Sequence, residues 1–220
     1  MSAPRRIVFL AVNVSYAHSN LAAWCLRSYA EDGQWDWHIR EFTLRDEAGR
    51  VAHEIATLEP QVLAATLYLF NRLFVLQVLH ACRRLLPRVC IVVGGPECLG
   101  DNRALLASGV VDAAVRGEGE RPLAALLRNL DDRSVWARIP GVCWQDRERY
   151  RDGRVAEVVE PLDDIPPFYG RYLRSFHRPF VQLETSRGCS NYCTFCTSAG
   201  RGVRVYSLPR VRHDLEDIRA

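Results

Sequence analysis

The sequence predicts an α/β fold built on a doubly wound, flavodoxin-like parallel sheet. Apolar segments with the length of strands alternate with helical segments in residues 1–130, and the connections between them are short. The third such segment, residues 62–69, is apolar almost throughout, which is typical of a parallel strand covered by helices on both faces. A chain of 220 residues with 48% hydrophobic content can also bury a sizeable core without disulfides.

The first two expected strands are joined by one helix. Residues 7–13 form an apolar strand. The helix of residues 19–32 begins at Ser19 and Asn20, which are common N-cap residues, and stops at Gly33. Residues 37–44 form the second strand, so the chain begins with a complete βαβ unit.

Residues 71–86 form the most regular helix of this half. Its apolar positions make one row: Leu73, Leu76, Leu79 and Cys82. We expect this row to face the sheet and His80, on the opposite side, to face solvent. Residues 89–95 and 112–117 complete the five strands, and residues 121–129 form the last helix.

Parallel sheets of this type bind ligands outside the carboxyl ends of their strands, and four loops at that edge carry suitable residues. Glycines there let a ligand approach the backbone, and helix N-termini present free N–H groups. The candidates are Ser15, Tyr16 and His18, then Tyr68, then Gly94, Gly95, Pro96 and Glu97, then Gly117, Glu118, Gly119 and Glu120. Each loop alone is equally consistent with a tight turn or a helix cap. Together they predict a ligand site without identifying the ligand.

Residues 131–167 are expected to be a linker hairpin without chemistry. Two short strand candidates, residues 139–145 and 154–159, flank Asp152-Gly153, and an Asp-Gly pair is a strong signal for a hairpin turn. Several prolines follow and interrupt regular structure.

The charged residues exclude several classes of protein. All 29 basic residues are arginine, so the chain has no lysine for Schiff-base chemistry or for a Walker-type phosphate loop. The net charge of +3 gives no reason to expect a nucleic-acid partner. No apolar run suits a signal peptide or approaches the ~20 residues that span a bilayer. We therefore expect a cytoplasmic protein without a membrane partner, in which the eight cysteines stay reduced.

Three of the cysteines are crowded into one loop. Cys189, Cys193 and Cys196 follow a strand expected at residues 181–185 and have the spacing C-x3-C-x2-C. Thiolates are ligands for iron–sulfur clusters and for zinc. A structural zinc wants four ligands, and His177 is the nearest other candidate. Three cysteines favour a cubane iron–sulfur cluster in which one iron has no cysteine ligand. The alternatives are a zinc-binding loop and thiols that bind no metal.

The segment from Arg187 to Cys196 resembles the signature loop of radical S-adenosylmethionine (SAM) enzymes. The resemblance implies that Cys189, Cys193 and Cys196 hold a 4Fe-4S cluster whose free iron binds SAM, and that Phe195 lies near the adenine of SAM. It also implies reductive cleavage of SAM to a 5′-deoxyadenosyl radical, with an electron donor such as flavodoxin or ferredoxin.

The N-terminal part resembles the cobalamin-binding domain of one branch of the radical SAM family. The resemblance rests on the stretch from Asn13 to Leu21 and on the glycine-containing loops at residues 94–97 and 117–120. It implies that the candidate loop residues bind cobalamin. The D-x-H-x-x-G motif that supplies a cobalt ligand in other cobalamin proteins is absent, so we expect cobalamin without a protein histidine ligand and His18 in a polar role.

These resemblances divide the chain into three parts. They are a cobalamin-binding-like domain (residues 1–130), the linker hairpin (131–167) and the start of a radical SAM βα barrel (168–220), with a helix at residues 207–219. A complete barrel takes about 250 residues, and no Gly-Gly-Glu motif for the SAM amino group follows the cysteine loop. We therefore expect a fragment or a truncated gene product that alone does not turn over SAM productively.

Two functions remain open at this point. The first is the N-terminal part of a cobalamin-dependent radical SAM enzyme that transfers a methyl group to an unactivated carbon. The alternative is a non-catalytic corrinoid-binding module with an orphan iron–sulfur or zinc loop. The sequence does not identify the substrate.

Overall fold

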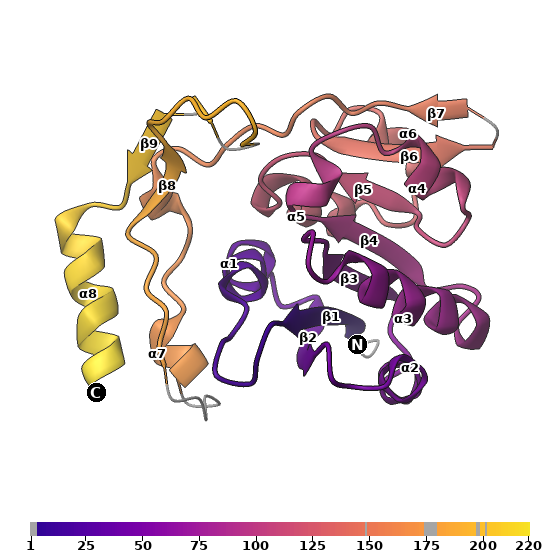
Figure 1. Cartoon of the computed structure of the whole chain (residues 1–220), viewed down its shortest axis with the longest axis horizontal. Helices are drawn as coiled ribbons and strands as arrows, with labels where there is room; N and C mark the ends of the chain where they lie inside the picture. The colour runs from indigo at the N-terminus through magenta and orange to yellow at the C-terminus, as the bar shows by residue number, and fades with distance from the viewer. Residues whose placement is uncertain (1–3, 148, 174–179, 197–198, 201) are drawn as a thin grey trace.

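The strands of the α/β part form one seven-stranded sheet (Figure 1). The computed structural model describes residues 4–147, 149–173, 180–196, 199–200 and 202–220. The parallel strands are β1 (Arg5–Asn13), β2 (Trp35–Thr43), β3 (Val62–Thr66), β4 (Cys90–Gly94) and β5 (Ala113–Val115). Their spatial order, β2-β1-β3-β4-β5, is the flavodoxin-like order, and the predicted fold class is confirmed.

Helices cover both faces of this sheet, and the alternation of side chains along β1 separates the two cores. Helices α1 (Leu21–Ala30) and α5 (Glu120–Arg128) pack on the face that receives Ile7 and Phe9. Helices α2 (Ala48–Ala56) and α3 (Arg72–Leu85) pack on the face that receives Val8 and Leu10. Both faces of β1 are buried from Ile7 to Val12, and this part of the strand is apolar throughout.

The buried row of α3 differs from the predicted one. Val75, Val78, Leu79 and Cys82 are the buried residues, whereas Leu73 is 77% exposed. His80 faces solvent as expected. Apolar residues occupy more than one stripe of this helix, so the periodicity alone does not select which stripe meets the sheet.

Four helices of the described residues were not predicted. Three of them are too short to show a clear period: α4 (Arg103–Ala107), α6 (Arg133–Trp136) and α7 (Tyr169–Tyr172). The fourth, α2, is as long as α5 and was missed although its buried residues Val51, Ala52 and Ile55 have helical spacing. Leu106 of α4 and Trp136 of α6 are nevertheless among the most deeply buried side chains of the protein.

The linker forms a hairpin, but at a different turn from the predicted one. Strands β6 (Val142–Asp146) and β7 (Arg149–Arg151) pair antiparallel, and β6 extends the sheet beyond β5. The Asp152-Gly153 pair lies after β7, where the Asp152 carboxylate binds Arg116 at 2.7 Å. Residues 154–159, all of them described, form no strand, so that part of the prediction is wrong.

The C-terminal segment packs beside α1 (Figure 1). It comprises α7 (Tyr169–Tyr172), the antiparallel strands β8 (Ser186–Cys189) and β9 (Gly202–Val205), and α8 (Leu208–Arg219). Two 3₁₀ turns lie earlier in the chain: η1 (Pro96–Cys98) and η2 (Leu162–Asp164). Helix α8 is confirmed. The strand expected at residues 181–185 is wrong, because the segment extends past Tyr169 and pairs only from Ser186 onward.

A third core joins the C-terminal segment to the α/β part. It brings Cys25 of α1 together with buried residues of the linker and of the C-terminal segment: Val159, Leu162, Ile165, Phe168, Tyr169, Tyr172 and Tyr206. Within the part of the chain that the structure describes, no helix combines the length and the apolar character needed to cross a membrane.

Candidate functional site

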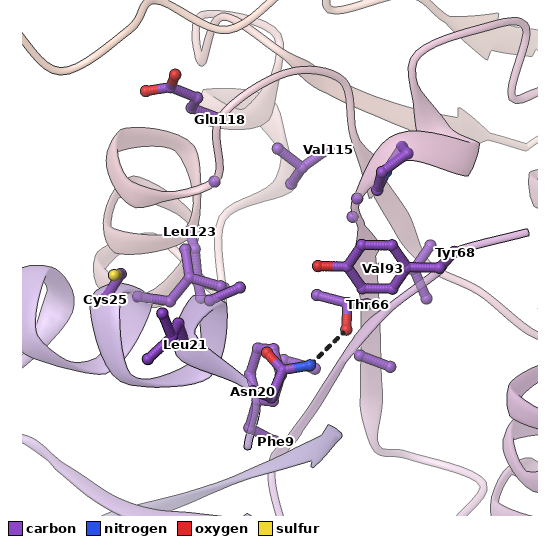
Figure 2. A pocket seen from close by; sticks show the side chains of 18 of the residues that line it. Phe9, Asn20, Leu21, Cys25, Thr66, Tyr68, Val93, Val115, Glu118 and Leu123 are labelled. Carbon is purple, nitrogen blue, oxygen red and sulfur yellow. Dashed lines mark hydrogen bonds between the residues drawn. The ribbon is translucent and has the colours of Figure 1, made fainter. Parts of the chain in front are cut away.

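A cavity of about 840 Å³ lies at the carboxyl ends of β1, β3, β4 and β5 (Figure 2). Helices α1 and α5 form one side, where Leu21, Cys25 and Leu123 line the space, and Tyr68 lies on the other side. Gln182, Glu184 and Arg187 of the C-terminal segment also line it. The residues just before the cysteine loop therefore complete a site that the sheet begins. We call this space the rim cavity.

Most of the loop residues predicted to bind a ligand do line the rim cavity. They are His18, Tyr68, Gly94, Gly95, Pro96, Gly117, Glu118, Gly119 and Glu120. They come from four separate loops, and the sheet topology brings them to one edge because parallel strands end together.

The other three predicted residues lie outside the lining and have protein partners. The Ser15 hydroxyl lies 2.9 Å from Nδ1 of His18, and the Tyr16 hydroxyl donates to Asp46. The Glu97 carboxylate pairs with Arg72 at 3.1 Å. Ser15 thus orients the His18 ring from the side of Nδ1, while Tyr16 and Glu97 hold neighbouring elements together.

The apolar lining of the cavity was not predicted from the sequence. Phe9, Val12, Leu21, Val93, Val115 and Leu123 line it. These residues sit in strands and helices whose patterns indicate a core, and no local signal separates a core position from a cavity wall. Their position at the carboxyl ends of parallel strands was the only available indication.

One buried hydroxyl in the lining has no partner among the described residues. Ser19 is 6% exposed, and its Oγ makes no hydrogen bond to any of them. Next to it in the chain, Asn20 caps α1 through Ala23 and donates from Nδ2 to Thr66 Oγ1 at 3.4 Å. Buried polar groups are normally satisfied, so the Ser19 hydroxyl suits a polar group of a ligand.

Tyr68 offers a second polar group in the cavity. Its ring stacks on Phe70 with 5.6 Å between centroids, and Figure 2 shows its hydroxyl directed into the space. Burial, together with the charge of Glu184, raises the pKa of Tyr68 above its ordinary value. The phenol is therefore neutral and can donate a hydrogen bond.

The glycines of the rim differ in what a side chain at each position would meet. A Cβ on Gly94 would lie 3.7 Å from Val115 Cβ, an ordinary contact, so this glycine leaves space in the cavity. Gly95 has φ +99°, and a Cβ there would lie 2.8 Å from the Leu67 carbonyl oxygen. A Cβ on Gly119 would lie 2.8 Å from Leu26 Cδ2 of α1. Gly95 is therefore required by the fold itself, whereas at Gly119 the neighbour is the end of a flexible leucine side chain, which can shift.

A cluster of charged residues closes the cavity on the side of the cysteine loop. Arg187 Nη1 lies 2.7 Å from Glu120 and 3.4 Å from Glu118, and its Nε lies 3.0 Å from Glu184. Arg204 also binds Glu118. We call these five residues the ion-pair cluster. Its carboxylates, two of them predicted as cobalamin contacts, bind protein arginines in this structure.

Cys25 lies in the cavity wall beside the ion-pair cluster. Its Sγ is 4.0 Å from Glu184 Oε2. Burial, and next the charge of Glu184, raises the pKa of this thiol far above its ordinary value. The thiol is therefore neutral and a poor nucleophile.

The cysteine loop follows β8. Cys189 ends the strand and is half-buried, while Cys193 and Cys196 are exposed and joined by a hydrogen bond from Cys196 N–H to the Cys193 carbonyl. Phe195 is 90% exposed. Among the described residues, no three His, Cys, Asp or Glu side chains are gathered so as to hold a metal ion, and His177 lies outside them. Three thiolates suit an iron–sulfur cluster chemically, but their sulfurs are not brought together.

Comparison with known proteins gives one family match and several relatives. Residues 7–127 match the B12 binding domain. The chain is 32% identical over 174 residues to the hopanoid C-3 methylase of Methylococcus capsulatus, which covers 76% of this chain and 34% of that protein. It is 27% identical over 238 residues to the cobalamin-dependent radical SAM methyltransferase TokK of Streptomyces tokunonensis, covering 97% of this chain and 35% of TokK.

The fold has a counterpart among solved structures. The cobalamin-dependent S-adenosylmethionine radical enzyme OxsB, with aqua-cobalamin and S-adenosylmethionine bound, matches with a TM-score of 0.76 and 20% identity, covering 98% of this chain and 31% of OxsB. This likeness supports the fold. The chain spans about a third of the length of the curated relatives that it matches.

Proposed function

The chain belongs to the family of B12 binding domains, and from this premise we propose that it is the cobalamin-binding part of a radical SAM methyltransferase. It is a cobalamin-binding module related to cobalamin-dependent radical SAM methyltransferases. The proposal adds a 4Fe-4S cluster, SAM and methyl transfer to an unactivated carbon.

The rim cavity carries the cobalamin part of this proposal. It is open at the edge where doubly wound sheets take their ligands, and it lies largely within residues 7–127, the range of the family match. The side formed by α1, α5 and the strand ends is largely apolar, which suits the macrocycle. The Ser19 and Tyr68 hydroxyls would bind the polar groups on the periphery of the cofactor, and Gly94 would leave it room.

The protein would orient cobalamin without supplying a histidine to the metal. His18 is the only histidine in the cavity lining among the described residues, and its Nδ1 lies against Ser15. We assign it to holding the loop between β1 and α1, where Asn13 also donates to the His18 carbonyl at 3.1 Å.

The cysteine loop carries the radical SAM part of the proposal. Cys189, Cys193 and Cys196 would hold the cluster, and Phe195 would lie against the adenine of SAM. When bound, cobalamin supplies a methyl carrier and the cluster supplies the electron that cleaves SAM. The electron donor would be a protein such as flavodoxin or ferredoxin, and the compartment would be the cytoplasm, where the thiols stay reduced.

A second function is favoured by the exposure of the cysteine loop. Cys193 and Cys196 face solvent, and the described residues contain no gathered metal-ligand set. A corrinoid-binding module that carries an orphan iron–sulfur or zinc loop agrees with this arrangement.

One set of measurements tests the proposal and separates the two functions. The chain is reconstituted anaerobically with iron and sulfide and titrated with hydroxocobalamin, followed by absorption and EPR. We expect cobalamin binding together with a 4Fe-4S signal that Cys193→Ala abolishes and that added SAM perturbs. Cys143→Ala, which removes a buried thiol of β6, is the matched control and should leave the signal intact.

Three results would decide against parts of the proposal. Binding of one zinc ion without a cluster, or a cluster signal that ignores SAM, would favour the corrinoid-binding module. Absence of cobalamin binding to a folded chain would overturn both functions.

A further inference from the structure

The strand that carries the first cysteine of the loop also carries a partly buried arginine. Arg187 and Cys189 of β8 are partly covered, while Ser186 and Gly188 are exposed. Gly188, between Arg187 and Cys189, has φ +100°, and a Cβ there would clash with the Gly202 carbonyl oxygen of β9. Only this one residue, held close against β9, separates Arg187 from Cys189, so the position of Arg187 constrains that of Cys189.

Arg187 is anchored to the α/β part by carboxylates that belong to the cavity wall. Glu120 is the first residue of α5 and is 3% exposed, and Glu118 lies just before it in the loop between β5 and α5. Both line the rim cavity, as do Glu184 and Arg187 itself. The hairpin of β8 and β9 and the cavity thus share one wall.

The ion-pair cluster depends on all its charges. Arg187 and Arg204 occupy paired positions of β8 and β9, an unfavourable arrangement for two like charges unless an anion neutralises them. Glu118 binds both, and Glu120 and Glu184 complete the environment of Arg187. Removing one member would leave poorly solvated charges without partners, which is strongly unfavourable.

From this arrangement we propose that Arg187 is a positioning residue that couples occupancy of the rim cavity to the position of the cysteine-bearing β8–β9 hairpin. A corrinoid in the cavity would contact the wall that Arg187 helps to form and would restrict the motion of the Arg187 side chain. Because Arg187 belongs to β8, the motion of β8, including Cys189, would be restricted as well. Because such coupling is reciprocal, loosening the hairpin would weaken corrinoid binding. The corrinoid half of this inference rests on the proposed function.

The experiment measures hydrogen exchange of β8 and β9 in the full chain, with and without hydroxocobalamin, and the affinity for hydroxocobalamin in the same samples. In the unsubstituted protein we expect hydroxocobalamin to slow exchange of the β8 amides. Arg187→Met should abolish that ligand-dependent change and weaken binding by about tenfold, within the usual range for coupled sites. Far-UV and near-UV circular dichroism checks that the α/β part remains folded.

Two further variants keep the result interpretable. Arg187→Lys retains the charge but lacks the forked guanidinium that reaches Glu120 and Glu184 at once, so we expect an intermediate effect even if the methionine variant folds poorly. Arg121→Met is the matched control, since Arg121 is on α5 beside Glu120 but pairs with exposed Glu157. It should change neither exchange of β8 nor corrinoid affinity.

The outcomes separate this inference from the proposed function. If Arg187→Met binds hydroxocobalamin like the unsubstituted chain and β8 still responds to the ligand, the coupling does not exist. If the unsubstituted chain binds no hydroxocobalamin, the proposed function fails. Hydrogen exchange of β8 in the ligand-free proteins still tests whether the ion pairs of Arg187 hold this strand. Arg187→Met should accelerate the exchange of β8 by about tenfold or more, and Arg121→Met should not.

Discussion

Arg187 and Arg204 face each other across the β8–β9 pair, and the carboxylate of Glu118 binds both. This ties a residue of the loop after β5 to two strands whose arginines lie 69 and 86 positions later in the chain. The contact ties the cysteine-bearing hairpin to the edge of the sheet where the rim cavity opens. The two halves of the proposed site therefore share residues, and each half is expected to respond to changes in the other.

The cysteines should fall into two classes of reactivity. Burial raises the pKa of Cys82, Cys90 and Cys98 to about 12, and it also raises the pKa of Cys25. These thiols should resist iodoacetamide at pH 8 in the native state, whereas the exposed loop thiols should react first. Mass spectrometry of alkylated peptides measures the order. Rapid labelling of Cys25 before the loop cysteines would contradict the packing of α1 against the C-terminal segment.

Substitution at two rim glycines should separate ligand binding from folding. Gly94→Val should leave the fold intact but lower cobalamin affinity at least about tenfold, because its side chain enters space that the glycine leaves open. Gly95→Ala should instead cost about 1–3 kcal/mol of unfolding free energy, because Gly95 has φ +99° and its Cβ would meet the backbone of Leu67. Urea unfolding and cobalamin titration of both variants provide the test. Equal affinity of Gly94→Val and the unsubstituted chain would place the ligand elsewhere.

The unpartnered hydroxyl of Ser19 should matter only when the ligand is bound. Ser19→Ala removes a hydroxyl that makes no hydrogen bond in the part of the chain that the structure describes, so the free energy of unfolding should not fall. Cobalamin affinity should fall about fivefold, the effect of one ordinary hydrogen bond. Ser108→Ala is the control, because its Oγ donates to the Leu105 carbonyl at 2.6 Å, away from the cavity lining. It should lower stability and leave affinity unchanged.

His18 should not be a cobalt ligand. His18→Ala should leave the visible spectrum of bound cobalamin unchanged in the bands that report a lower nitrogen ligand. Some loss of affinity is compatible with this, because His18 lines the cavity and contacts Ser15. A shift of those bands on substitution would show that the ring reaches the metal.

The start of α8 should be sensitive to acid. Asp163 accepts a hydrogen bond from the backbone of Ser207, the N-cap of α8, at 2.9 Å, and hydrogen bonds from Ser207 lower the pKa of Asp163 below its ordinary 3.8. A carboxyl with a lowered pKa stabilises the folded state above its unfolded pKa, and this is lost as the pH falls through the folded value. Asp163→Asn should therefore destabilise the protein by less than about 1 kcal/mol at pH 7, because the contact is exposed. The difference from the unsubstituted chain, measured by urea unfolding, should shrink as the pH falls below the ordinary pKa of 3.8 and vanish once the pH is below the lowered pKa of the folded state. If the difference in unfolding free energy does not change with pH, the effect of the substitution comes from packing and not from the charge of Asp163.

Much of the α/β part could be predicted from the sequence. The five parallel strands, the cap of α1 at Asn20 and the gathering of four loops at one edge all follow from short-range patterns and from the connectivity that such sheets require. The cysteine spacing is likewise a property of the sequence. These features depend on residues close together in the chain, or on general rules for how neighbouring elements connect. They can therefore be predicted from the sequence pattern.

The tertiary structure decided what those features do. It placed Glu118 and Glu120 against Arg187 and Arg204, although the local sequence Gly-Glu-Gly-Glu is equally suited to a ligand. It placed the hairpin turn between β6 and β7 and left Asp152-Gly153 beyond β7, where Asp152 binds Arg116. It also left the Ser19 hydroxyl without a partner among the described residues. A side chain's partner is set by residues distant in the chain, and the free energy of burying a charge or a hydroxyl depends on that partner, so the sequence pattern alone could not assign these roles.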